Sequence, residues 1–77
     1  MDRTEEKIIL AVCQQLKEEE FAYTVEFSGV MWDVYYHETH GRDVTIAFCM
    51  KDGKAVIGVF SAGRLGEEEV RRKLYVQ

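Results

Sequence analysis

The middle of the chain alternates between apolar and polar residues with a period of two, which is typical of half-buried β-strands. The apolar positions of the first two runs are Phe21, Tyr23, Val25, Phe27, Val30, Trp32, Val34 and Tyr36. The third run has Val44, Ile46, Phe48 and Met50, and a fourth strand is predicted over residues 55–60. Short polar turns separate the runs, so we expect a four-stranded antiparallel meander.

Helical patterns flank these strands. The apolar residues that recur at helical spacing near the start of the chain are Ile9, Val12, Cys13 and Leu16. Asp2 or Thr4 can cap this first helix. Near the end of the chain, Gly66 can cap a second helix with glutamates at 67–69 and basic residues at 71–73, as the helix dipole favours. The sequence therefore predicts a single α+β domain over residues 1–77, with an N-terminal helix, the meander and a C-terminal helix.

Turn chemistry predicts the register of the sheet, because a one-residue slip would turn every side chain to the other face. Ser28-Gly29 and Asp52-Gly53 are expected as two-residue hairpin turns, and residues 38–42 as a five-residue loop. This arrangement places Trp32 beside Phe48 and gathers the large apolar residues on one inner face. We expect both helices to cover that face.

The residues of opposite phase then form an outer face with several apolar side chains. Six of them are predicted to bind a partner: Met31, Asp33, Tyr35, Cys49, Val56 and Phe60. Contiguous exposed apolar surface commonly marks an interface, and aromatic residues and methionine are enriched in interface cores. We therefore expect a protein-interaction module whose partner is a second copy of the chain or a larger protein that it inhibits.

The charge and the terminal residues narrow the class of partner. The net charge of −4 and the pI near 5.1 argue against direct nucleic-acid binding, which needs a basic patch. The apolar run at residues 8–13 is too short for a membrane span or a secretory signal, so we expect a cytoplasmic protein without a membrane partner. Two cysteines cannot build a disulfide framework.

The candidate chemical groups do not form a reactive set. His37-Glu38-Thr39-His40 is one residue short of the zinc-protease pattern and lies at a predicted hairpin, where the helical geometry is missing. Whether His37 and His40 bind a metal weakly stays open, but no metal site and no cofactor are expected. Cys13 and Cys49 are expected on opposite sides of the sheet. Since no nucleophile, base and orienting group converge, we do not expect an enzyme.

An alternative function is an acidic mimic of nucleic acid that occupies the cationic groove of a nucleic-acid-processing protein. Its carboxylates would come from Glu18–Glu20, Glu26, Asp33, Glu38 and Asp43. The chain is similar in size and sign of charge to small phage-encoded inhibitors such as the anti-CRISPR proteins. Its element order also resembles a double-stranded-RNA-binding domain at a coarse level, but glutamates at 67–69 stand where such a domain has phosphate-binding lysines, so the resemblance implies no such activity.

Overall fold

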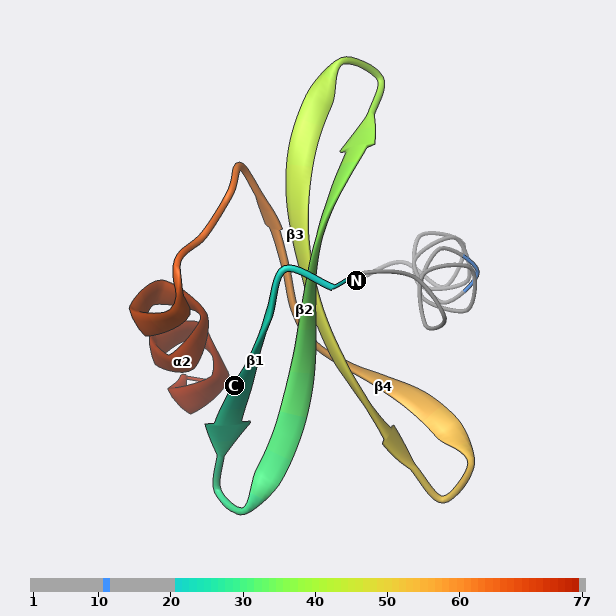
Figure 1. The fold of residues 1–77 in the computed structure, drawn as a ribbon, viewed down its shortest axis with the longest axis vertical. Helices are drawn as coiled ribbons and strands as arrows, with labels where there is room; N and C mark the ends of the chain where they lie inside the picture. The colour runs from blue at the N-terminus through green and yellow to red at the C-terminus, as the bar shows by residue number, and fades with distance from the viewer. Residues whose placement is uncertain (1–10, 12–20, 77) are drawn as a thin grey trace.

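The computed structural model describes residue 11 and residues 21–76, which form an antiparallel sheet with one helix beside it (Figure 1). The strands are β1 (Tyr23–Phe27), β2 (Val30–Thr39), β3 (Arg42–Lys51) and β4 (Lys54–Ala62), and the helix is α2 (Glu67–Tyr75). Their order in the sheet is β1-β2-β3-β4. The predicted meander and C-terminal helix are confirmed. The predicted N-terminal helix, and its place on the sheet, lie outside the described residues.

Each hairpin closes with a two-residue turn whose second residue is glycine. The backbone φ angle is 53° at Ser28, His40 and Asp52, and 72–77° at the glycine that follows each of them. Positive φ at both central residues is the mark of the turn that matches the twist of antiparallel strands. Ser28-Gly29 and Asp52-Gly53 are therefore confirmed as turns, whereas the predicted five-residue loop is wrong. The strands run on through residues 38 and 39 because His40-Gly41 turns the chain in two residues.

The tight turn at His40-Gly41 makes the register of β2 against β3 differ by one residue from the predicted register. Val34 pairs with Ala47 and Tyr35 with Ile46, while Phe48 lies opposite Asp33. The predicted pairing of Trp32 with Phe48 is therefore wrong. Because side chains alternate between the two faces, the shift puts Ala47 on the same face as Val34 and sends Ile46 and Phe48 to the other.

A bulge in β4 changes the register within the β3–β4 pair. Phe48 pairs with Ile57, but Ala47 pairs with Val59, so Gly58 is an additional residue on β4. A Cβ atom built on Gly58 would lie 2.4 Å from Leu74 Cδ2. The glycine thus lets the backbone of β4 approach α2 closely.

The sheet consequently has a buried apolar cluster on each face, whereas a buried cluster was expected on the inner face alone. We call the side on which α2 packs the helix face and the opposite side the far face. The buried cluster of the helix face consists of Val25, Val34, Ala47, Val59, Leu65, Val70 and Leu74. The buried cluster of the far face consists of Tyr35, Val44, Ile46 and Phe48. The expectation of a single inner face beneath both helices is corrected by this division.

The helix itself begins where the sequence predicted. Gly66 is the N-cap, and Glu67, Glu68 and Glu69 fill the first turn. Arg71 donates to Glu67 at 3.1 Å, one turn apart on the exposed side. Only Val70 and Leu74 are buried, so α2 covers a limited part of the helix face.

The segment between β4 and α2 is fastened to the sheet by polar side chains. The Thr45 hydroxyl donates to the Gly63 carbonyl at 2.7 Å and accepts from the Leu65 N–H at 2.9 Å. The Leu65 carbonyl accepts from Tyr23 at 2.6 Å and from Tyr36 at 2.7 Å. Burial, followed by the neighbouring Tyr36, raises the pKa of Tyr23 above its ordinary value. The Tyr23 hydroxyl is already protonated at neutral pH, and the raised pKa extends its role as a donor to more alkaline pH.

The shared carbonyl predicts a coupling between the two tyrosines. Tyr23→Phe and Tyr36→Phe should each lower the free energy of unfolding by about 0.5–1.5 kcal/mol, the usual net value of one hydrogen bond. The double variant should lose more than the two single losses together, because only then does the Leu65 carbonyl lose both donors. Urea unfolding of the four proteins measures this coupling. Strictly additive losses would show that water replaces either hydroxyl equally well.

Candidate protein-interaction surface

The six residues predicted to bind a partner do not share one exposed face. Met31, Val56 and Phe60 are exposed, Asp33 is half-buried, and Tyr35 and Cys49 are buried. The alternation within the strands and the observed pairs place Met31, Asp33, Tyr35 and Phe60 on the far face, with Cys49 and Val56 on the helix face. The prediction of a single surface made of all six is corrected. The six residues divide between two faces because the register of β2 against β3 differs by one residue from the predicted register.

Tyr35 is a core residue of the far face. Only 1% of it is exposed, and its ring stacks on Phe48 with centroids 5.5 Å apart. Phe21 meets the same ring edge-on at 6.1 Å. Such pairs add to the stability that comes from burial alone. Of the far-face residues predicted to touch a partner, Met31 and Phe60 remain accessible.

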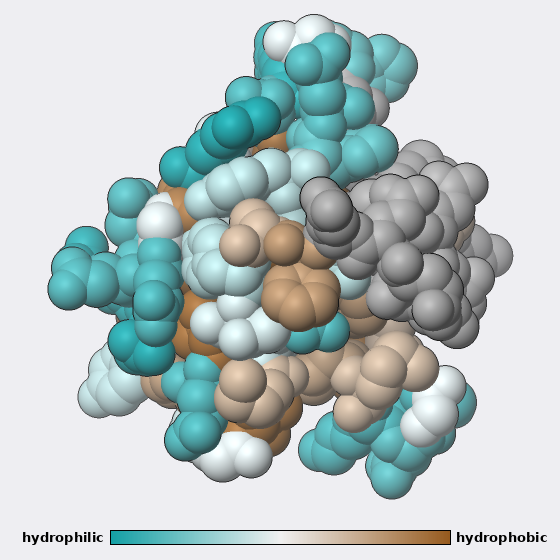
Figure 2. All heavy atoms as spheres, in the orientation of Figure 1, coloured by the Kyte–Doolittle hydropathy of each residue, from teal (hydrophilic) through white to brown (hydrophobic). Residues whose placement is uncertain are grey.

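The helix face has a hollow between two of the hairpins. The turns at residues 28–29 and 52–53 lie at the same end of the sheet (Figure 1), and Figure 2 shows apolar surface between these two tips. The hollow has a volume of about 250 Å³ and is lined by Val30, Trp32, Cys49, Met50, Lys51 and Val56. We call this set the hairpin-tip hollow. It joins two residues of the predicted surface, Cys49 and Val56, to Lys51 and to three residues that the sequence placed on the inner face.

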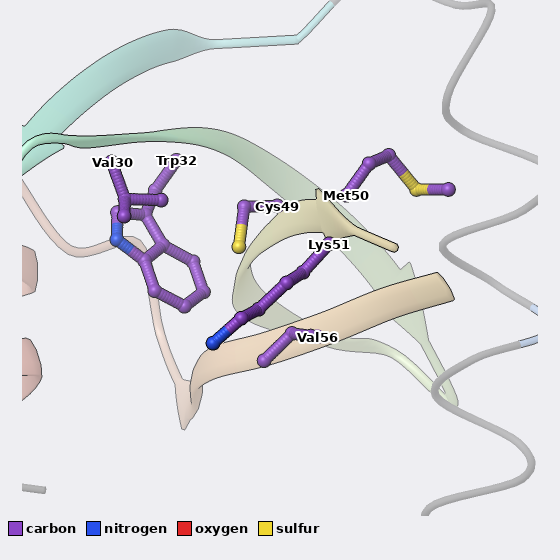
Figure 3. Close-up of a pocket in the computed structure, with 6 residues that line it drawn as sticks. All are labelled: Val30, Trp32, Cys49, Met50, Lys51 and Val56. Carbon is purple, nitrogen blue, oxygen red and sulfur yellow. The ribbon is translucent and has the colours of Figure 1, made fainter. Parts of the chain in front are cut away.

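Not all the side chains that line the hollow point into it (Figure 3). The Cys49 thiol and the Lys51 side chain extend toward the Trp32 ring and Val56, whereas Met50 points away. Val30 and Val56 expose 39% and 37% of their surface, so the hollow is accessible from outside. Trp32 Nε1 is buried and has no hydrogen-bond partner within the described part of the chain.

The polar groups of the hollow are the Cys49 thiol and the Lys51 ammonium. Burial raises the pKa of the Cys49 thiol, although the nearby Lys51 partly opposes this effect. The thiolate is the nucleophilic form of cysteine, so a raised pKa makes Cys49 a poor nucleophile at neutral pH. Lys51 faces Lys54 across the last pair of β3 and β4. Neither ammonium forms an ion pair of 4 Å or less with a described residue.

Sequence reasoning missed Val30 and Trp32 as lining residues of an open hollow for an identifiable reason. Their phase matched the inner face, and an inner face was expected to be covered along its whole length. The predicted C-terminal helix had only Val70 and Leu74 as apolar contacts, which are too few to cover strands of ten residues. The thin apolar stripe of that helix was the available signal that the strand ends beside the turns would stay open.

The two histidines lie near the same hairpin turn but differ in exposure. His37 lies half-buried on β2 and His40 is exposed in the turn. Within residues 21–76 no three His, Cys, Asp or Glu side chains are grouped so that they could hold a metal ion. The same part of the chain contains no helix with the length and apolar character needed to cross a membrane.

Comparison with known proteins identifies no similar protein. No family model, no curated protein and no solved structure matches the chain. The candidate surface therefore rests on the geometry of the hairpin-tip hollow.

Proposed function

We propose that this protein is a small non-catalytic interaction module that binds a protein partner through the hairpin-tip hollow. The observation that carries the proposal is an accessible apolar hollow built on two neighbouring hairpins of one sheet. Apolar surface that remains open on a small domain commonly marks a binding site. Strands held in a ladder also offer a surface that is already ordered before binding, which lowers the entropy lost on association.

The hollow has the features of a pocket for an anchor residue. Binding energy at protein interfaces is concentrated in a few buried side chains that fill such pockets, with a polar rim around them. Here Trp32 and the two valines provide the apolar contact, and the lysines at the hairpin tip provide a polar rim. The partner is either a second copy of this chain or a larger protein.

Val56→Asp tests the proposal directly. The side chain is accessible, so the aspartate is expected to leave the fold intact while placing a charge in the apolar contact. We expect binding of the partner from source-cell extract, or self-association measured by sedimentation velocity, to weaken at least tenfold, since a desolvated charge costs more than about 1.4 kcal/mol. Circular dichroism and urea unfolding should stay close to those of the natural chain.

Met31→Asp is the matched control, because Met31 is also accessible, at 54% against 37% for Val56, but lies on the far face. It should bind as the natural protein does. Loss of binding in Met31→Asp with normal binding in Val56→Asp would move the interface to the far face and overturn the proposal. Binding that survives both variants but disappears at high salt would favour the acidic nucleic-acid mimic, since exposed charges are screened by salt.

A further inference from the structure

We infer that the hairpin-tip hollow recognises an acidic segment, in which an apolar side chain fills the hollow and an adjacent carboxylate meets Lys51 and Lys54. This inference rests on the proposed function and specifies the chemistry of its partner. It is carried by the size of the hollow and by the charges at its rim.

The size of the hollow limits what can enter it. Pockets that enclose drug-sized ligands have volumes of about 300–1,000 Å³. The hairpin-tip hollow, at about 250 Å³, lies below that range. Its volume suits one side chain or a small molecule with a single apolar group. Val30, Trp32 and Val56 offer apolar contacts, so the group that enters is aliphatic or aromatic.

The rim of the hollow carries a local positive charge on an acidic protein. Lys51 and Lys54 lie directly opposite each other at the end of the β3–β4 ladder. Like charges in this arrangement oppose each other and destabilise a strand pair. Asp52, in the turn between them, makes no ion pair of 4 Å or less with either ammonium.

A carboxylate from outside would relieve the repulsion between the two lysines. The chain as a whole has a net charge of −4, so its overall field does not attract an acidic ligand. Attraction would have to be local, within the Debye length of about 8–10 Å at physiological salt. Lys51 both lines the hollow and faces Lys54, so an apolar group in the hollow brings a neighbouring carboxylate within that range.

Three small probes separate the apolar part of this recognition from the charged part. These are 4-phenylbutyrate, 4-phenylbutanol and 4-phenylbutylamine, which share one apolar group and differ in charge. Trp32 is the single tryptophan of the chain and lines the hollow, so its fluorescence reports occupancy. Amide shifts in nuclear magnetic resonance spectra locate the probe. We expect the acid to bind about fivefold more tightly than the alcohol, and the amine most weakly.

Removal of the two positive charges should abolish the preference for the acid. In Lys51→Met with Lys54→Met the acid and the alcohol should bind equally, because methionine keeps an apolar stem and lacks the ammonium. Arg72→Met with Lys73→Met is the matched control, since it makes the same change in net charge on exposed positions of α2. That control should keep the fivefold preference.

The outcomes distinguish this inference from the proposed function. If all three probes shift the amides of Val30, Cys49 and Val56 but bind with equal affinity, acidic recognition is wrong while the hollow still binds apolar groups. If no probe shifts these amides, the hollow does not accept a side chain and the inference also fails. In either case the binding of Val56→Asp to the partner decides the proposed function independently.

Discussion

Gly58→Ala is expected to lower the free energy of unfolding by about 2 kcal/mol, within the usual cost of overpacking a core. The added Cβ would lie 2.4 Å from Leu74 Cδ2 and 2.7 Å from Trp32 Cζ3. The leucine methyl can move, whereas the larger Trp32 ring packs against the buried cluster of the helix face and has less freedom to turn aside. The residue that makes the bulge of β4 is therefore also a point of close approach between the sheet and α2.

Urea and thermal unfolding measure this loss, which corresponds to a fall in melting temperature of about 8–16 °C for a domain of this size. Gly66→Ser is the control at a second glycine, where an added side chain meets nothing within 4 Å. It should raise stability by a few tenths of a kcal/mol, since a serine hydroxyl can cap the helix that now lacks a side-chain cap. A Gly58→Ala protein as stable as the natural chain would show that α2 does not pack as closely as described.

Thr45→Val should cost about 2–3 kcal/mol although it preserves the shape of the side chain. Thr45 is fully buried, and its hydroxyl both donates to the Gly63 carbonyl and accepts from the Leu65 N–H. Valine can do neither, so the Leu65 N–H would be left buried without an acceptor. An unsatisfied buried donor costs more than the lost hydrogen bond alone.

Thr45→Ser keeps the hydroxyl and removes one methyl group, so it should lose only about 1 kcal/mol. Urea unfolding compares the two variants, and amide hydrogen exchange at Leu65 should accelerate in the valine variant alone. Equal losses in serine and valine would assign the role of Thr45 to its methyl group. The hydrogen bonds to Gly63 and Leu65 would then contribute little to holding the segment before α2.

The sequence predicted the strands and the C-terminal helix well because their signals are local. Alternation marked the first three strands, glycine in the second position marked two of the turns, and charge order marked the start of the last helix. The fourth strand was marked by the apolar run that follows the Asp52-Gly53 turn. Each of these signals depends on residues only a few positions apart. The turn at His40-Gly41 carried the same signal, but the polar residues around it were interpreted as a longer loop.

The candidate surface was predicted in part because it depends on register. Val56 is accessible and Cys49 lines the hollow, whereas Tyr35 is in the core. One residue of difference at the second turn inverted β3 relative to β2 and divided the expected surface between two faces. The alternation within β3 does not report such a shift, because both phases of this strand present apolar side chains.

The amino-acid sequence by itself determined the strands, two of their turns and the C-terminal helix, since backbone preference and side-chain period are properties of short segments. Only the tertiary structure decided which side chains share a face, because that follows from how separate strands pair. It also decided where the helix face stays open, because α2 has just two buried side chains and reaches only part of the sheet. The hairpin-tip hollow results from this strand pairing together with the limited cover that α2 provides.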